Sequence, residues 1–341
     1  MNIKNISEYL YGYASDEKLL LVSFFITNSM ALVQLKKEWA EKKANPGRVV
    51  KSAVDPSDFG GSIALADPYK LEQGFIAEIP LPFAFGLCFN EKNRSLYVAS
   101  SNTVRQIKGG YCLKLLNNNL FNDLHSLGIT LSGNLLVVAT GTDSVLEVDF
   151  ENSRQVIWEW LATEHGYNTD QSGQRRVTDR HTNCQLVATP TSEQTTHINT
   201  AIDWSDKILA TLFHQGQLIE IDKKSKERKI VLSGLKSPHN IRKTKKGFIL
   251  SDSRANRVLL LNSNFQIEKE IKRDFDWVQD AWEFQEGETY ILGDSNNDRL
   301  VSVDISGKLI SALHWAKSSK KISAIEFIDA SQARDIFCPA F

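Results

Sequence analysis

The stretch Ser237–Asn262, with the sequence SPHNIRKTKKGFILSDSRANRVLLLN, is the most informative part of this chain for its fold. It holds three short runs in which apolar residues recur at alternate positions, and turn-forming residues separate these runs. A fourth run of the same kind follows at residues 266–271. Short runs with a period of two are typical of β-strands rather than helices. The stretch therefore predicts four consecutive strands, which is the content of one propeller blade.

The same pattern restarts along the chain at nearly constant intervals. Successive starts are 40, 72, 42, 41 and 43 residues apart, and an aliphatic residue follows each of the first five after eleven positions. These starts are Phe85, His125, His197, His239, Asp280 and Ser323. Four of the five intervals match the length of a four-stranded blade. We therefore expect an all-β fold in which residues 1–341 form a single six-bladed β-propeller, with a pair of open sheets as the alternative.

The two ends of the chain are expected to share one blade and so to close the ring. Ser323 begins the inner strand of this blade, and three runs nearer the N-terminus supply its other strands: Leu19–Phe25, Met30–Leu35 and Phe75–Pro80. A ring closed in this way leaves no exposed sheet edges that would pair with another chain.

Two polar segments interrupt the pattern as insertions, residues 36–72 and residues 161–195. Because neighbouring strands alternate in direction, the second insertion is expected on the face where the inner strands begin. On that face it is a candidate lid over the mouth of the central channel. The first insertion is expected on the opposite face.

Charge and composition argue against several classes of function. Forty basic and 41 acidic side chains leave a formal net charge of -1, so we expect neither nucleic acid nor an anionic membrane as a partner. The N-terminus lacks the pattern of a secretory signal, and the longest apolar run, Leu19–Ile26, is too short to span a bilayer. The four cysteines are widely separated, which argues against a disulfide framework. These features predict a cytoplasmic protein.

Histidines occupy three of the six starts, namely His125, His197 and His239. Equivalent positions of a circular repeat point at one axis, so the three imidazoles are expected to meet in the channel. Three neutral imidazoles leave an open coordination position, which suits a divalent metal, with Zn²⁺ preferred over another first-row metal or Ca²⁺. Asp280 and His214 are expected near the same mouth, as catalytic groups that move a proton.

This arrangement predicts an enzyme that carries out lyase or hydrolase chemistry on a small polar substrate or peptide at the channel mouth. Two alternatives remain open at this point. One is metal-free group transfer through a channel histidine. The other is a binding scaffold for a protein, in which the histidines only bind channel water.

Parts of the chain resemble known families. Ser237–Asn262 resembles the NHL repeat, with looser copies near Phe85, His125 and Val278, and this resemblance implies a six-bladed propeller. The three start histidines look like the zinc-binding set of the peptidyl-hydroxyglycine lyases. Another set of segments is similar to bacterial arylsulfotransferases and implies group transfer, although Phe213 stands where that family has an arginine. These segments are Val145–Asp149, Val156–Trp160, Thr196–Asn199 and Ile208–Gln215.

Overall fold

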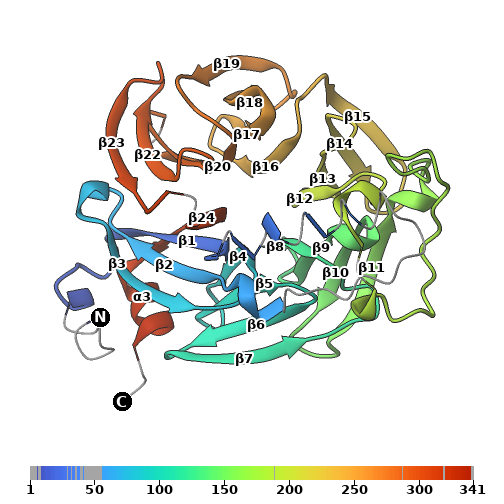
Figure 1. The fold of residues 1–341 in the computed structure, drawn as a ribbon, viewed down its shortest axis with the longest axis horizontal. Helices are drawn as coiled ribbons and strands as arrows, with labels where there is room; N and C mark the ends of the chain where they lie inside the picture. Colours follow the sequence, from blue (N-terminus) through green and yellow to red (C-terminus); the bar gives the residue numbers. More distant parts are fainter. Residues whose placement is uncertain are drawn as a thin grey trace.

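A ring of six four-stranded antiparallel sheets makes up the protein (Figure 1). The computed structural model describes residues 6–338, apart from residues 7–8, 29, 32, 35–36, 39–40, 42–55, 188, 286 and 318. The sheets stand around a central axis, and one edge strand of each sheet lies innermost (Figure 1). The prediction of an all-β, six-bladed propeller is confirmed.

Five blades are continuous in sequence, and each is an up-and-down sheet. Blade 1 contains β4 (Ala84–Asn90), β5 (Ser95–Ser100), β6 (Thr103–Lys108) and β7 (Tyr111–Leu116). Blade 2 contains β8 (Leu124–Ile129), β9 (Leu135–Ala139), β10 (Ser144–Asp149) and β11 (Gln155–Leu161). Blade 3 contains β12 (Ile198–Trp204), β13 (Lys207–Leu212), β14 (Gln217–Asp222) and β15 (Arg228–Ser233). Blade 4 contains β16 (Pro238–Lys243), β17 (Gly247–Asp252), β18 (Arg257–Asn262) and β19 (Ile267–Lys272). Blade 5 contains β20 (Val278–Phe284), β21 (Thr289–Asp294), β22 (Arg299–Asp304) and β23 (Leu309–His314).

The sixth blade, called the closing blade below, joins the two ends of the chain. Its strands follow the order β24 (Lys321–Asp329), β1 (Lys18–Ile26), β2 (Ser62–Ala66) and β3 (Phe75–Pro80). The short helix α3 (Ala330–Phe337) follows β24 and packs its apolar side chains into the same blade. The prediction of a blade shared by both ends is therefore confirmed.

One strand of the closing blade differs from the prediction. The third strand is β2, whereas the described residues of Met30–Leu35 are helical. All five residues of β2 are buried, and they pair with β1 from Leu20↔Ala66 to Phe24↔Ser62. This strand lies inside the range 36–72, so the boundaries predicted for the first insertion were wrong. The run was missed because it is only five residues long and is rich in small residues.

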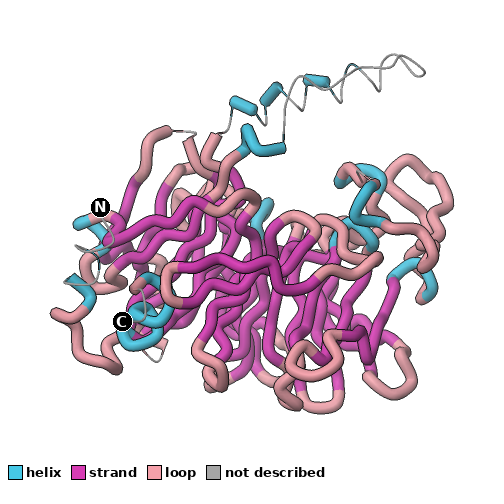
Figure 2. The backbone as a smooth tube through the Cα atoms, turned by 90° about the horizontal axis from the view of Figure 1, so that it is seen from below, coloured by secondary structure: helices cyan, strands magenta, loops and turns pink. Residues whose placement is uncertain are grey.

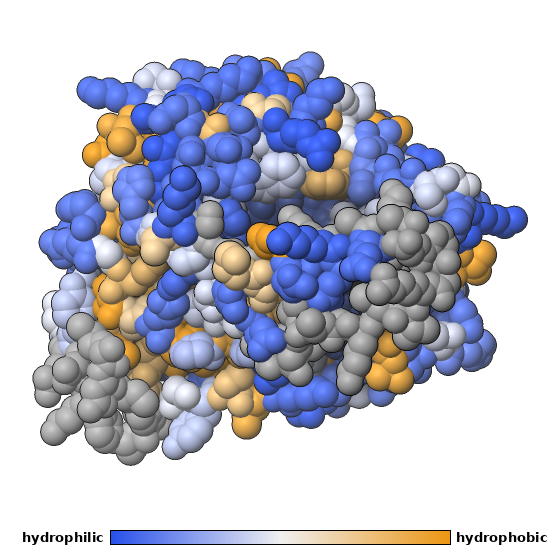
Figure 3. Space-filling view, in the orientation of Figure 1, coloured by the Kyte–Doolittle hydropathy of each residue, from blue (hydrophilic) through white to orange (hydrophobic). Residues whose placement is uncertain are grey.

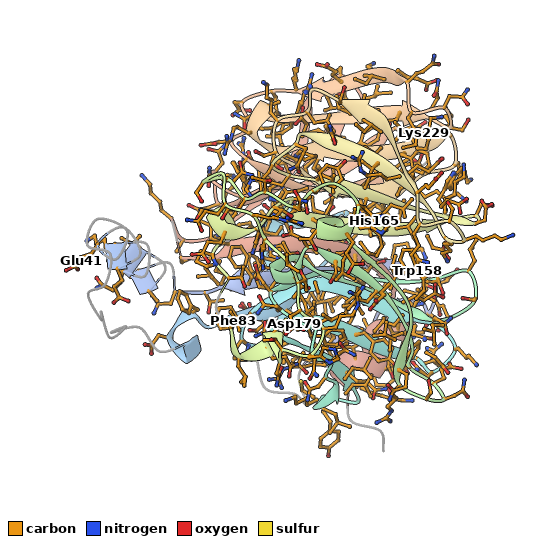
Figure 4. The ribbon with its side chains drawn as sticks, turned by 90° about the vertical axis from the view of Figure 1, so that its right-hand side faces the viewer. Glu41, Phe83, Trp158, His165, Asp179 and Lys229 are labelled. Atoms are coloured by element: carbon orange, nitrogen blue, oxygen red, sulfur yellow. The ribbon has the colours of Figure 1, made fainter. Side chains whose placement is uncertain are left out.

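The first insertion lies on the other face of the ring from the one predicted. It is the connection between β1 and β2 and covers residues 27–61. Since β24 runs away from the face where inner strands begin, β1 returns to that face and the connection lies on it. Figure 2 shows the described helical residues of this connection on the same side of the ring as the second insertion. In Figure 4, Glu41 projects on the side where Phe83 and Asp179 also lie.

The core lies between the blades, because each sheet is covered on both faces by its neighbours. Three of the second strands, β9, β17 and β21, are consequently buried along their whole length. Burying one aliphatic side chain of this kind stabilises the fold by about 1.5–3 kcal/mol. The face seen in Figure 3 is mostly hydrophilic, with apolar residues scattered over it. No helix in the described part of the chain is long and apolar enough to cross a membrane.

Candidate functional site

The inner strands share a backbone feature that fixes which residues are equivalent around the axis. The residue immediately before each of five inner strands has a positive φ, between 50° and 68°, which non-glycine residues rarely adopt. These residues are Phe83, Asp123, His197, Ser237 and Trp277. A shift in pairing follows just inside each of these strands, at the same place in all five blades. The blades can therefore be aligned residue by residue.

The alignment confirms the equivalence of His125 and His239 but not that of His197. Each of the first two stands two residues after its positive-φ residue, and Asn199 occupies this place in blade 3. His197 is itself the positive-φ residue. The predicted alignment of His197 with the other two histidines was wrong by two residues. Side chains on one face of a strand repeat every second residue, so a shift of two residues still places a buried aliphatic residue eleven positions later: Ala210 is buried like Ile208.

The imidazoles and aromatic rings form a continuous set of contacts, called the aromatic layer below. The rings of His125 and His197 meet edge to face, with centroids 5.0 Å apart. The Phe213 ring contacts both His197, at 4.9 Å, and His239, at 5.3 Å. The layer ends in Trp277 beside His239 and in Phe85 beside His125: Phe85, His125, His197, Phe213, His239 and Trp277.

Backbone carbonyls set the tautomers of two of these imidazoles. The Nδ1–H of His125 donates to the Asp123 carbonyl oxygen at 2.9 Å. The Nδ1–H of His239 is directed at the Ser237 carbonyl oxygen at 3.1 Å and at the Ser253 hydroxyl at 2.7 Å. A carbonyl oxygen only accepts, so the proton lies on Nδ1 and Nε2 carries the lone pair. This is the arrangement that a histidine needs to accept a proton or to bind an electrophile at Nε2.

His197 is held by a residue of the second insertion. Its Nδ1–H donates to the side-chain oxygen of Gln194. The Gln194 amide nitrogen donates in turn to Asp123 Oδ2, at 3.2 Å, and to the Thr189 carbonyl oxygen, at 3.1 Å, which fixes the direction of the amide. The loop therefore reaches the aromatic layer and orients one of its histidines.

Burial keeps the deepest histidines neutral. Desolvation lowers the pKa of His239 to about 3, and it holds the pKa of His197 well below its ordinary value of 6.5. Neighbouring imidazoles add to the effect at His197, and the Asn199 side chain opposes it. Desolvation also lowers the pKa of His214, whose Nε2–H donates to the Thr191 carbonyl oxygen at 3.0 Å. His214 thus carries its proton on the other nitrogen, and its ring lies 5.8 Å from that of His197.

The predicted metal site stays a prediction from the sequence. Within the described residues, no group of three or more His, Cys, Asp or Glu side chains is placed to hold a metal ion. The Phe213 ring contacts both His197 and His239. His197 does not occupy the position in its blade that His125 and His239 occupy in theirs. A Zn²⁺, other first-row metal or Ca²⁺ ion thus remains a prediction from the sequence, and no chemical step below depends on it.

Asp280 lies in a separate cluster and not in the aromatic layer. It is fully buried, and it forms a two-pronged ion pair with Arg242, with distances of 3.0 Å to Nε and 2.5 Å to the terminal nitrogen. Its oxygens also accept from the backbone N–H groups of Ala281 and Ile325, both at 2.8 Å. In the aligned blades Asp280 matches Asn240, one residue beyond the histidine position. The hydrogen bonds found for Asp280 among the described residues go to these three partners only.

A chamber of about 280 Å³ occupies the axis beneath the aromatic layer. All six inner strands contribute to its wall. His125 and Asn240 line it near the strand starts, and Ile129 and Lys243, the last residues of β8 and β16, line it at the other end. The chamber therefore runs down the channel towards the face opposite the two insertions.

Two further chamber residues were not found from the sequence. Glu326 on β24 accepts a hydrogen bond from Arg242 at 3.3 Å. Desolvation raises the pKa of Glu326 to about 7, which Arg242 opposes and Asp280 reinforces. Cys88 lies close by, and burial raises the pKa of its thiol. The only signal in the sequence was the likeness of Ser-Ala-Ile-Glu-Phe at Ser323 to Asp-Ala-Trp-Glu-Phe at Asp280, which marked a repeat rather than a site.

Comparisons with known proteins show the propeller class and nothing finer. No protein-family profile and no curated protein sequence matches the chain. A crystal structure of a protein of unknown function from Bacteroides caccae is similar, with TM-score 0.53 and 14% identity over 92% of this chain and 99% of that chain. A propeller in a nidogen/laminin complex is similar with TM-score 0.54 and 11% identity, over 91% of this chain and 97% of that chain. A virginiamycin B lyase from Staphylococcus aureus has a TM-score of 0.48 and 9% identity, over 73% of this chain and 86% of that chain.

Proposed function

We propose that this propeller is an enzyme that uses His125 as a general base in lyase or hydrolase chemistry on a small polar substrate in the central channel. One observation carries the proposal. His125 is the histidine of the aromatic layer that lines the chamber, and its Nδ1–H is already engaged by the Asp123 carbonyl oxygen at 2.9 Å. Its Nε2 is therefore a proton acceptor at a place that a substrate can reach.

The other members of the aromatic layer support this base. The His197 ring packs against His125, and His197 is held by Gln194. The Phe85 ring covers His125 from the other side at 4.7 Å. Packing on both sides restricts the imidazole to one orientation, and general-base catalysis depends on such positioning.

A mixture of small polar compounds, followed by NMR for loss of substrate and gain of product, tests this function. The wild-type protein is expected to convert at least one compound. His125→Gln is expected to slow that conversion by about 100-fold or more, since a positioned base typically contributes 10²–10⁴-fold. His314→Gln, which replaces an exposed histidine on β23, is the matched control and should leave the rate unchanged. Equal rates for the wild type and His125→Gln would contradict the proposal.

A further inference from the structure

We infer that the chamber binds an uncharged polar substrate that enters from the face opposite the two insertions, and that Glu326 serves there as the acid opposite the base His125. The inference rests on the proposed function and deepens it by naming a substrate class, an entrance and a second catalytic residue.

The entrance follows from the residues at the two ends of the chamber. Both insertions lie on the face where the inner strands begin, and the second one holds His197 through Gln194. At the other end the wall is made by Ile129 and Lys243, and Lys243 is exposed. A small molecule therefore reaches His125 from the end that carries no insertion.

The charges of the chamber favour an uncharged ligand. The Arg242 guanidinium is already neutralised by Asp280 and also donates to the Ile325 carbonyl oxygen at 2.5 Å. Its face packs on the Trp282 ring at 4.5 Å, while Lys243 lies over the Trp204 ring at 5.0 Å. Lys243 lies at the exposed end of the chamber, so a charged ligand beside Arg242 would lose its hydration without gaining an uncompensated partner and should bind more weakly than an uncharged one.

Glu326 is the chamber group best suited to give up a proton. Its carboxyl takes one hydrogen bond from Arg242 and lines the same chamber as His125. Its burial, and to a lesser extent the negative Asp280 beside it, favours the protonated form and raises its pKa to about 7 in spite of Arg242.

His125 and Glu326 together can supply both proton transfers of an elimination in this chamber. His125 Nε2 takes a proton as a C–H bond of the substrate breaks, and the electron pair forms a C=C bond. The bond to the leaving group breaks with its electrons, and Glu326 gives its proton to that group. The proton on His125 then returns to Glu326 through solvent, so the net change is loss of the protonated leaving group.

Three probes with one scaffold and different charges test the chamber in the whole protein. These are N-acetylglycinamide, which is uncharged, N-acetylglycine, which is an anion, and glycinamide, which is a cation under mildly acidic conditions. The reporter is the indole N–H of Trp282, which lines the chamber and donates to the Ile325 carbonyl oxygen at 2.8 Å. We expect the uncharged probe to shift this signal with saturation, and both charged probes to bind about tenfold more weakly.

Two variants separate the chamber from other binding places. Gly128 lines the chamber, and a Cβ on it would meet only the Leu136 Cβ at 4.0 Å, so Gly128→Leu fills the chamber without a backbone clash. It should abolish the shift, whereas Leu131→Ala, at an exposed residue next to β8, should not.

Binding in the wild type should weaken as pH rises through about 7, where Glu326 loses its proton, and Glu326→Gln should remove this dependence. Glu283→Gln on the neighbouring inner strand is the control that keeps it.

Three outcomes would overturn the inference: no shift of Trp282 up to the solubility limit of the probes, equal or tighter binding of a charged probe, or binding that survives Gly128→Leu. Failure here is distinguishable from failure of the proposed function. If the probe binds as expected but turnover does not need His125, the chamber stands and the general base is wrong. If turnover needs His125 but the probe does not bind, the general base stands and the inference about the chamber is wrong.

Discussion

At the residue scale, the protein separates its titratable groups into two environments. His125 and His239 have their Nδ1 protons held by backbone carbonyls, and burial keeps His239 neutral. Asp280 is instead buried and paired with Arg242. The sequence indicated which histidines approach the axis but not this pairing, because Arg242 is an ordinary basic residue in a run of lysines.

The single-residue prediction concerns Glu326 and the pH dependence of stability. Its pKa is about 7 in the folded chain and has an ordinary value of 4.5 when exposed, so between these values the folded chain binds more protons than the unfolded chain. The free energy of unfolding should therefore fall as pH rises from about 4.5 to about 7, by roughly 3 kcal/mol for a shift of this size. Glu326→Gln should remove this part of the slope.

Urea unfolding of both proteins at several pH values measures this difference. Glu283→Gln is the control, because Glu283 lies on a neighbouring inner strand outside the chamber wall. Parallel curves for the wild type and Glu326→Gln across this pH range would show that the Glu326 carboxyl is not held protonated by its surroundings.

At the scale of single elements, turn residues of one blade hold the start of the next inner strand. The buried carboxylate of Asp143, in the turn before β10, accepts from the backbone N–H groups of Thr195, Thr196 and His197 at 2.7–2.9 Å. Asn256 repeats the contact in blade 4 with a single hydrogen bond to the Trp277 N–H at 2.9 Å. These bonds stabilise the positive φ of His197 and Trp277.

Asp143 accepts from three backbone N–H groups and Asn256 from one, so the two residues should differ in their effect on stability. Asp143→Ala should lower the free energy of unfolding by roughly 3 kcal/mol, because several buried N–H groups lose their acceptor. Asn256→Ala removes one such bond and should cost about 1 kcal/mol. Hydrogen exchange of the amides at 195–197 should speed up in the first variant and not in the second. Equal destabilisation by the two variants would contradict the role of Asp143.

The strand pattern was predictable from the sequence, while the connections between strands were not. Alternating apolar residues located the inner and second strands, since each buried face repeats with a period of two. The same period hid the two-residue slip at His197, because either register buries an aliphatic residue. β2 was missed for a similar reason: Ser62–Ala66 is short, and its residues lack the bulk that marks the other strands.

At the scale of the whole molecule, the ring depends on closure by β24. This strand pairs with β1 from Lys18↔Asp329 to Ile26↔Lys321, and it supplies Glu326 and the backbone N–H of Ile325 to the channel cluster. The sequence predicted this closure because the starts are evenly spaced and both termini carry unmatched strands. The order of strands within the closing blade depended on β2 and was only partly predictable.

Removal of the closing strand should therefore affect all six blades. A chain ending at Lys320 exposes the edge of β1 and leaves Asp280 without one of its backbone donors, so it should show no cooperative thermal transition and should associate. A chain ending at Cys338, which keeps β24 and α3, is the control and should melt like the full chain. Circular dichroism and size-exclusion chromatography provide the readout. A monomeric, cooperatively melting chain that ends at Lys320 would show that closure is dispensable.

A long-range ¹H–¹⁵N NMR spectrum of the histidine side chains in the wild type, assigned with His125→Gln, tests whether His125 is the base of the channel. At mildly alkaline pH we expect His125 to carry its proton on Nδ1 and to have an unprotonated Nε2, as the bond to the Asp123 carbonyl requires. A His125 signal with the proton on Nε2, or with both nitrogens protonated, would contradict the assignment of His125 as the base of the channel.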